Sequence, residues 1–283
     1  MKIAVIGLGR MGRGIALNLL RKGYEVSGFD IDENSIKKLK GIKNFIPLKS
    51  IFYAKDANFI LLVLPTGKEV LETINQFDDY KGIIIDMTTL GYDELDEIKK
   101  IVSKKKLNYI SSKIERGPAD AEAGKLILYV GGDESLFNKS IDLLKDMGDF
   151  IYVGSDEQAN LVKLISTLLL TANTLLLAEI SLIHDKIGID KEILLKALSM
   201  GGADSVQLRS RFPMIINNSY KEVFSISLGS YVAEKMIEFM RKEGINYTPL
   251  LTDVTEILKF GRILGTGNKD IAEIATLYKK LNH

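Results

Sequence analysis

The first 154 residues alternate short apolar segments of strand length with longer segments of helical periodicity. The short segments are apolar throughout rather than at every second position, which is typical of strands buried on both faces of a sheet. This alternation predicts an α/β fold with a mostly parallel, doubly wound sheet and helices on both faces. The segments that we expect to be strands are KIAVIG, EVSGFD, NFILLVLP, GIIIDMT, LNYISS, KLILYVGG and DFIYVG.

After Gly154 no further strand is expected, because the rest of the chain has helical periodicity. Ser155 is a good N-cap for a long helix that should run to about His184, spanning roughly 40 Å at about 1.5 Å per residue. No linker rich in proline or glycine separates the two halves, so this helix should join them. We therefore predict two domains, an α/β domain of residues 1–154 and an all-helical substrate and dimerisation domain of residues 155–283. Further helices are expected at 187–198, 224–244 and 248–264.

The composition of the chain excludes several kinds of functional site. The chain has no cysteine, which excludes disulfides and thiolate sites, and its two histidines, His184 and His283, are too few and too separated for a zinc site. With 38 basic against 37 acidic residues the formal net charge is +1, so nothing predicts electrostatic capture of nucleic acid or of an anionic membrane. A small molecule is the expected ligand, and no metal is expected.

The apolar segment 161–183 is the candidate for a membrane span, but Lys163, Asn173 and Glu179 interrupt it. We interpret this segment as a buried helix. The chain begins MKIAVIG, which has the pattern of a strand and lacks the basic and apolar regions of a signal peptide. These features predict a cytoplasmic protein without membrane contact.

The first expected strand runs into GLGRMG, which begins at Gly7 and matches G-x-G-x-x-G. In a dinucleotide-binding Rossmann domain Gly7 permits the tight turn, Gly9 lets the pyrophosphate approach the backbone, and Gly12 lets the next helix pack against the strand. Arg10 and Met11 then lie in the first turn of that helix, whose amides hold the phosphates. Glycine turns also serve as mere connectors, but the position between an N-terminal strand and an amphipathic helix favours nucleotide binding.

Asp30 lies at the end of the second expected strand, where dinucleotide-binding domains place an acidic residue. Its carboxylate should accept hydrogen bonds from the hydroxyls of the adenosine ribose and repel a 2′-phosphate. The sequence therefore predicts NAD, with NADP as the alternative. Asp32 could share this role, and Asp30 could instead be a solvated turn residue.

The glycine loop and its surroundings, AVIGLGRMGRGIALNLLRKG, resemble the N-terminal signature of the β-hydroxyacid dehydrogenases, the family of 3-hydroxyisobutyrate dehydrogenase within the 6-phosphogluconate dehydrogenase superfamily. VLPTGKEV is similar to the family's segment beside the nicotinamide ribose, which implies that Leu64 and Pro65 contact the cofactor. IIDMTTL resembles its Asp-x-Ser-Thr segment and places Thr89 there. Since GGADSVQLRSR and FSISLGSYV also have counterparts, the resemblance covers nearly the whole chain. It implies a homodimer or homotetramer.

The segment SSKIERGPADAEAGKL is similar to the family's substrate loop, which reads roughly Asp-x-Pro-Val-Ser-Gly-Gly-x-x-x-Ala-x-x-Gly and binds the substrate carboxylate. In this register Glu115 occupies the Ser position, Arg116 the first Gly and Gly117 the second. Lys113 falls at the Pro position. The alternatives are a loop that folds without binding substrate, or a register error of one or two residues.

Lys163 matches the family's catalytic lysine, which lies early on the helix between the domains and faces the nicotinamide. The Asn that follows in the family four residues later is Thr167 here, whose hydroxyl could still donate to a substrate oxygen. Asn160 lies one turn before Lys163 on the same side. The alternative for Lys163 is an exposed lysine on an amphipathic helix.

Where the family often has Lys-Asp in the C-terminal half, this chain has Tyr231 and Val232.

The resemblance implies hydride transfer between a nicotinamide and a small hydroxy acid or its oxo or semialdehyde form, with Lys163 as general acid in reduction and general base in oxidation. Arg116 would hold the substrate carboxylate, and Glu115 would pair with Lys163 or with Arg116. Beside Lys163 a carboxylate favours the protonated amine and thus reduction. Two alternatives remain, an imine reductase-like enzyme, which generally lacks the lysine, and an NAD(P)-binding protein without catalysis.

Overall fold

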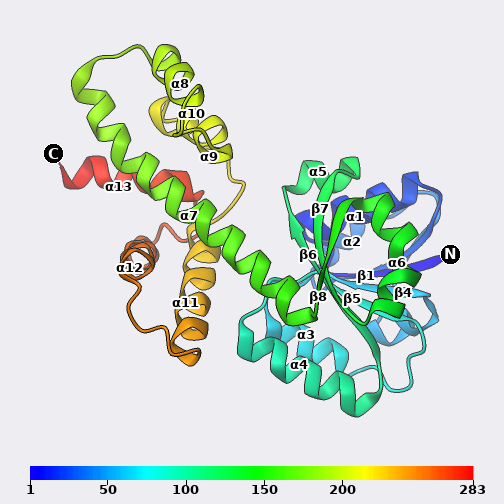
Figure 1. The fold of residues 1–283 in the computed structure, drawn as a ribbon. Helices are drawn as coiled ribbons and strands as arrows, with labels where there is room; N and C mark the ends of the chain where they lie inside the picture. The colour runs from blue at the N-terminus through cyan, green and yellow to red at the C-terminus, as the bar shows by residue number, and fades with distance from the viewer. Residues whose placement is uncertain (283) are drawn as a thin grey trace. The chain divides into compact units, whose positions relative to one another are not determined.

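The computed structural model describes residues 1–282, and His283 lies outside the described residues. The chain forms two compact units, Met1–Lys163 and Leu164–His283. One helix, α7 (Asp156–Ile187), begins in the first unit and continues in the second. An α/β unit followed by helices confirms the predicted fold class (Figure 1). The predicted domain boundary after residue 154 stays a prediction.

The first unit contains one eight-stranded sheet. Its strands are short and mostly apolar, as the sequence predicts, and several are buried along their whole length. The strands are β1 (Lys2–Ile6), β2 (Glu25–Phe29), β3 (Phe45–Pro47), β4 (Phe59–Leu62), β5 (Ile83–Asp86), β6 (Asn108–Glu115), β7 (Leu126–Gly132) and β8 (Gly148–Gly154).

The strand order is β3-β2-β1-β4-β5-β6-β7-β8, and the pairs from β3 to β6 are all parallel. Only β6 and β7 pair antiparallel. From β1 the chain proceeds first toward β2 and then returns to β4 on the other side. At such a reversal the loops after two neighbouring strands lead away to opposite faces and leave a crevice at their carboxyl ends.

Helices cover both faces of the sheet (Figure 1). One apolar cluster packs between the sheet and helices α1, α5 and α6, and a second packs between the sheet and α3, α4 and a 3₁₀ helix, η1. This double cover explains the continuous apolar strands. The helices of the unit, with the short α2, are α1 (Arg10–Arg21), α2 (Glu33–Lys37), η1 (Ile51–Asp56), α3 (Gly67–Ile74), α4 (Tyr92–Lys105), α5 (Pro118–Ala123) and α6 (Glu134–Met147).

Strand β3 is the one strand that the sequence analysis did not predict. It has three residues, ends in Pro47 and lies at the edge of the sheet. Proline cannot donate a ladder hydrogen bond and is tolerated at an edge, where only one neighbour is needed. A segment this short has no periodicity to reveal it, so only the tertiary pairing with β2 defines it as a strand.

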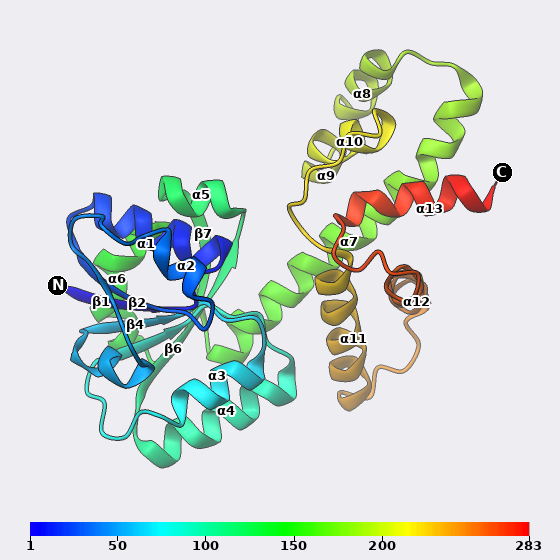
Figure 2. The same ribbon diagram turned by 180° about the vertical axis from the view of Figure 1, so that it is seen from behind.

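The second unit is helical in its described part (Figure 2). Helices α11 and α12 pack against each other, and α8, α9 and α10 contact one another. Arg211 and Asp270 form a buried ion pair, and the Asp270 carboxylate also accepts backbone hydrogen bonds from Val223 and Phe224. This pair ties three segments together. Besides α7, the elements are α8 (Lys191–Ser199), α9 (Val206–Ser210), α10 (Phe212–Ile216), α11 (Ile226–Lys242), α12 (Pro249–Ile263), η2 (Ile271–Glu273) and α13 (Ile274–Leu281).

Among the described residues, the helical segment Asp156–His184 is long and apolar enough to cross a membrane by length and composition alone. The core helix of a soluble protein meets the same criteria. In its most apolar window 39% of the residues are buried within the chain.

The N-terminus of α7 is fixed to the sheet through charged and polar side chains. Ser155 caps the helix as predicted, since its hydroxyl accepts from the amide of Gln158 at 3.3 Å. The Asp156 carboxylate accepts from the amide of Ser111 in β6 at 2.8 Å and lies 3.8 Å from the ammonium of Lys99 in α4. Burial raises the pKa of Asp156 to about 6, against the opposing effect of Lys99.

Asp156→Asn should stabilise the protein at neutral pH. A carboxyl whose pKa is raised in the folded state binds its proton more tightly there, so the wild type loses stability as the pH rises from about 4 to about 6. Asn keeps the acceptor for the Ser111 amide and lacks the buried charge. Relative to wild type, the free energy of unfolding of the variant should rise by about 1–3 kcal/mol over this window.

Urea unfolding between pH 4 and pH 7 measures this difference, and Glu97→Gln, which changes an exposed acid on α4, is the control. A difference between Asp156→Asn and wild type that does not change with pH would contradict the raised pKa.

Candidate active site

The glycine loop after β1 is closely packed at two of its three glycines. Gly7 has a φ of +93°, which favours glycine, and its amide donates to the carbonyl of Phe29 at 2.9 Å. A Cβ on Gly7 would collide with the carbonyl oxygen of Val63, and a Cβ on Gly12 would collide with that of Gly7. The loop therefore needs glycine at both positions, one for the turn and one for the approach of α1.

Gly9 differs, because a Cβ built there would meet no atom within 4 Å. Helix α1 begins next to it, at Arg10, with no side-chain cap and no acidic residue in its first turn. The first amides of a helix have no partners within the helix and carry a partial positive charge, which suits an anion. The open side of Gly9 and this uncapped helix start fit the pyrophosphate of a dinucleotide.

Asp30 is held beside the glycine loop. One oxygen of its carboxylate accepts from the amide of Leu8 at 2.6 Å, and the other accepts from the amide of Asp32 at 2.8 Å. Asp32 instead caps α2, and the hydrogen bond from the Asn34 amide lowers the pKa of its carboxyl. The structure thus separates two carboxylates that the sequence left as alternatives, with Asp30 next to the loop and Asp32 occupied at a helix start.

Leu64 and Pro65 follow β4, next to β1 in the sheet, and Thr89 follows β5. The hydroxyl of Thr88 accepts from the amide of Leu64 at 3.2 Å, so the two turns are joined directly. Pro65 is exposed and Thr89 is partly buried. These residues lie at the same carboxyl edge of the sheet as the glycine loop.

Lys163 and Glu115 form an ion pair, with Nζ and Oε1 3.2 Å apart and side chains only 14% and 17% exposed. Glu115 ends β6, and Lys163 lies near the start of α7. Desolvation lowers the pKa of Lys163, and the charge of Glu115 partly opposes that shift. Of the two partners that the sequence analysis offered for Glu115, the structure pairs it with Lys163.

Arg116 has a φ of +75°, a left-handed conformation that is unusual for a residue with a side chain. This agrees with its alignment to a glycine of the family loop. Its guanidinium is exposed and donates to the carbonyl of Lys125 at 2.8 Å, so it lies against its own loop. Gly117 then caps α5, and its amide donates to Asp120 at 3.3 Å.

Asn160 and Thr167 occupy the helix turns on either side of Lys163 along α7. The side chain of Asn160 is buried and bonds to both backbone groups of Leu90, accepting from the amide at 3.3 Å and donating to the carbonyl at 2.8 Å. It therefore holds the turn after β5 rather than a ligand. Thr167 is buried and belongs to the second unit.

Sequence analysis gave Lys113 only a place in the loop alignment and gave Asp86 no role. Both are fully buried and form an ion pair of 2.9 Å. The Lys113 ammonium also donates to the carbonyl of Thr88 at 2.7 Å, and the hydroxyl of Tyr109 donates to Asp86 at 2.8 Å. Burial and the neighbouring Asp86 raise the pKa of Tyr109 well above its usual value. The available signal was a lysine inside a strand, between Ser112 and Ile114.

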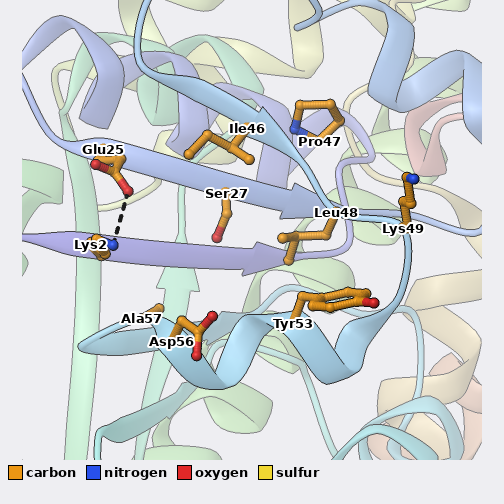
Figure 3. A pocket seen from close by; sticks show the side chains of 10 residues that line it. All are labelled: Lys2, Glu25, Ser27, Ile46, Pro47, Leu48, Lys49, Tyr53, Asp56 and Ala57. Carbon is orange, nitrogen blue, oxygen red and sulfur yellow. Dashed lines mark ion pairs between the residues drawn. The ribbon is translucent and has the colours of Figure 1, made fainter.

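A pocket of about 430 Å³ lies elsewhere in the unit, between β2, β3 and η1 (Figure 3). Its side chains include the ion pair of Lys2 and Glu25 at 3.6 Å and the ring of Tyr53. None of the predicted site residues lines it. Within residues 1–282, no group of three His, Cys, Asp or Glu residues could hold a metal ion.

Two family models match the chain. Residues 2–154 match the NAD-binding domain of 6-phosphogluconate dehydrogenase, and residues 158–278 match the NAD-binding model of NADP-dependent 3-hydroxyisobutyrate dehydrogenase. Together they cover nearly all of the chain.

Two curated relatives match over almost their whole length. The 2-(hydroxymethyl)glutarate dehydrogenase of Eubacterium barkeri is 26% identical over 99% of this chain and 96% of that protein. The glyoxylate/succinic semialdehyde reductase 1 of Arabidopsis thaliana is 23% identical over 99% of both chains. The solved structure of Mycobacterium tuberculosis 3-hydroxyisobutyrate dehydrogenase with L-serine superposes with a TM-score of 0.86 at 21% identity, covering 98% of each chain.

The glycine loop, the acidic residue after β2 and the strand reversal are the features of a dinucleotide-binding domain, and together with the comparisons they define an NAD(P)-dependent oxidoreductase. The chain belongs to the 3-hydroxyisobutyrate dehydrogenase-like β-hydroxyacid dehydrogenase family. The predicted family, the enzyme class and the use of NAD or NADP are thereby confirmed. The roles of individual site residues stay predictions.

Substitutions of the loop glycines should affect NADH binding and the stability of the fold differently. Gly9→Ala adds a methyl group into open space, so it should leave thermal stability close to wild type and weaken NADH binding about tenfold or more, because the methyl group lies where the pyrophosphate approaches. Gly12→Ala collides with backbone and should destabilise the fold by more than about 3 kcal/mol.

Calorimetric titration with NADH and thermal unfolding measure the two effects. Wild-type affinity for NADH in Gly9→Ala would show that the pyrophosphate does not lie against this glycine.

Proposed function

We propose that the protein transfers a hydride between NAD and a small hydroxy acid or its oxo or semialdehyde form, with Lys163 as general acid and base. The observation that carries this proposal is the ion pair of Lys163 with Glu115, at the carboxyl edge of the sheet that also carries the glycine loop. A largely buried amine beside a carboxylate can hold a proton or release it at a fixed position. When bound, the nicotinamide supplies the hydride donor or acceptor.

In this proposal Gly7, Gly9 and Gly12 shape the loop around the pyrophosphate, and the amides of Arg10 and Met11 contribute to its binding. Asp30 receives the adenosine ribose, since its carboxylate is fixed beside the loop by the Leu8 amide. A carboxylate there repels a 2′-phosphate, which favours NAD over NADP. Leu64, Pro65 and Thr89 line the nicotinamide half of the cofactor from the turns after β4 and β5.

Lys163 has opposing influences on its proton. Desolvation favours the neutral amine, and Glu115 stabilises the ammonium. In reduction the ammonium gives its proton to the substrate oxygen as that oxygen gains negative charge. In oxidation the neutral amine takes the proton back from the hydroxyl. Glu115 favours the charged form of Lys163 and thus the reductive direction.

The substrate residues in this proposal are Glu115, Arg116, Gly117 and Thr167. The guanidinium of Arg116 is exposed and donates one hydrogen bond to the Lys125 carbonyl. Its remaining N–H groups could donate to a substrate carboxylate. The names of the relatives support an anionic substrate, because 2-(hydroxymethyl)glutarate, glyoxylate and succinic semialdehyde are all small carboxylates.

We further propose a cytoplasmic homodimer or homotetramer without nucleic acid or membrane as partner. Three large apolar side chains on α7, Leu169, Leu176 and Ile183, recur every seven residues and are 60%, 55% and 58% exposed. An apolar stripe of this kind on a long helix favours burial against another subunit. Light scattering of the purified protein decides the number of subunits.

Oxidation of NADH and NADPH in the presence of glyoxylate, succinic semialdehyde, methylmalonate semialdehyde and tartronate semialdehyde tests the reaction. We expect turnover with at least one of these acids, faster with NADH. Lys163→Ala should lower kcat by roughly 10²–10⁴-fold, the usual contribution of a general acid. Arg116→Ala should raise KM for the acid with little change in kcat.

Tight NADH binding without turnover in the wild type would favour the alternative of a catalytically silent NAD(P)-binding protein. Turnover of a cyclic imine instead of the acids would favour the imine reductase-like alternative. An unchanged KM in Arg116→Ala would remove that residue from the substrate site.

The pH dependence of reduction should move when Glu115 is neutralised. Glu115 raises the pKa of Lys163, so Glu115→Gln should let that pKa fall further below its ordinary value. Reduction needs the protonated amine, and its alkaline limb should therefore shift to lower pH in the variant. The kcat profile between pH 6 and pH 10 measures this shift, with Glu122→Gln, an exposed acid of α5, as the control. An alkaline limb at the wild-type position would show that Glu115 does not tune Lys163.

A further inference from the structure

The buried ion pair of Lys113 and Asp86 is not used in the reaction described above. Both side chains are fully buried, one from β6 and the other at the end of β5. The Lys113 ammonium has three acceptors, the Asp86 carboxylate at 2.9 Å, the Thr88 carbonyl at 2.7 Å and, more weakly, the Asp86 carbonyl at 3.5 Å. All three belong to the turn that leaves β5.

This turn is connected to the neighbouring one. The Asp86 carboxylate accepts from the amide of Thr88 at 2.9 Å, which closes the start of the turn. The hydroxyl of Thr88 accepts from the amide of Leu64, in the turn that leaves β4, at 3.2 Å. A continuous chain of hydrogen bonds therefore runs from Lys113 through Thr88 to Leu64.

Stability does not explain the ion pair. Taking both charges out of water costs free energy that their attraction barely recovers, and apolar residues of similar volume often serve a core equally well. What the pair supplies is a fixed geometry, because an ammonium with three acceptors and a carboxylate with three donors hold one arrangement of the turn. The carboxylate receives its third donor from the Tyr109 hydroxyl.

We propose that Lys113 is a positioning residue for the nicotinamide cofactor. Its ammonium fixes the turn after β5 and, through Thr88, the turn after β4, so that Thr89 and Leu64 are held in place for the cofactor. This inference rests on the proposed placement of those two residues at the nicotinamide half of the site. Lys113 itself contacts neither cofactor nor substrate in this proposal.

The double variant Lys113→Met/Asp86→Asn tests the proposal. The single change Lys113→Met would leave a buried carboxylate without its counter-charge and threaten folding. In the double variant both charges are absent, methionine fills the space of the lysine stem, and Asn keeps the acceptor for the Thr88 amide. We expect a melting temperature close to wild type and a Kd for NADH, measured by calorimetry, raised about tenfold or more, as for the loss of one or two hydrogen bonds.

A second variant, Thr88→Val, breaks the same chain at its next bond and leaves the ion pair intact. It should also raise the Kd for NADH, and it carries the test if the double variant does not fold. In steady-state kinetics both variants should raise KM for NADH more than they lower kcat.

Lys105→Met is the matched control. The Lys105 ammonium also donates to backbone carbonyls, those of Asn75 and Phe77, and pairs with a carboxylate, Asp78. These groups precede β5 and so lie at the opposite edge of the sheet from the cofactor turns. This variant should lose a little stability and bind NADH normally.

Wild-type affinity for NADH in folded Lys113→Met/Asp86→Asn, or in Thr88→Val, would overturn the proposal and leave Lys113 a purely structural residue. An equal loss of affinity in Lys105→Met would overturn it as well, because the effect would then be general. NADH binding is measured without substrate, so a wild type that binds NADH and turns over no hydroxy acid would refute the proposed reaction and leave this test intact.

Discussion

The parallel direction of β1 to β6 is the constraint on which the site depends. Parallel neighbours have their carboxyl ends at one edge, so the loops that follow β1, β2, β4, β5 and β6 all emerge there. Residues far apart in sequence, from Gly7 to Glu115, are thereby brought to one edge. The reversal of strand order separates the loop after β1 from the loop after β4, and at their start Gly7 packs tightly against Val63.

Two ion pairs lie near this edge, and their environments differ. Lys113 and Asp86 are fully buried, and their ammonium and carboxylate each have three hydrogen-bond partners, which favours one arrangement of the turn after β5. Lys163 and Glu115 are slightly exposed, and Oε1 of Glu115 has no hydrogen bond that satisfies normal geometry within the described residues. This second pair is the one to which the proposed reaction assigns the proton transfer.

The loop after β6, which the proposed function assigns to the substrate, has an unusual backbone conformation. Arg116 has a φ of +75°, a left-handed conformation that glycine adopts more readily than a residue with a long side chain. Glu115 turns toward Lys163 rather than toward Arg116. The loop therefore combines a backbone conformation that favours glycine with charged side chains at two successive positions.

Sequence alone determined the fold class and the glycine loop, because each depends on local pattern, namely apolar runs or glycine spacing. It also drew attention to Lys163, as a lysine within an apolar helix. It could not separate Asp30 from Asp32 or choose the partner of Glu115, since the sequence leaves either choice open and only contacts across the sheet decide. It missed β3, which is defined by its neighbour alone, and the pairing of Lys113 with Asp86. That pair joins residues of two different strands, and only the register of β5 beside β6 brings them together.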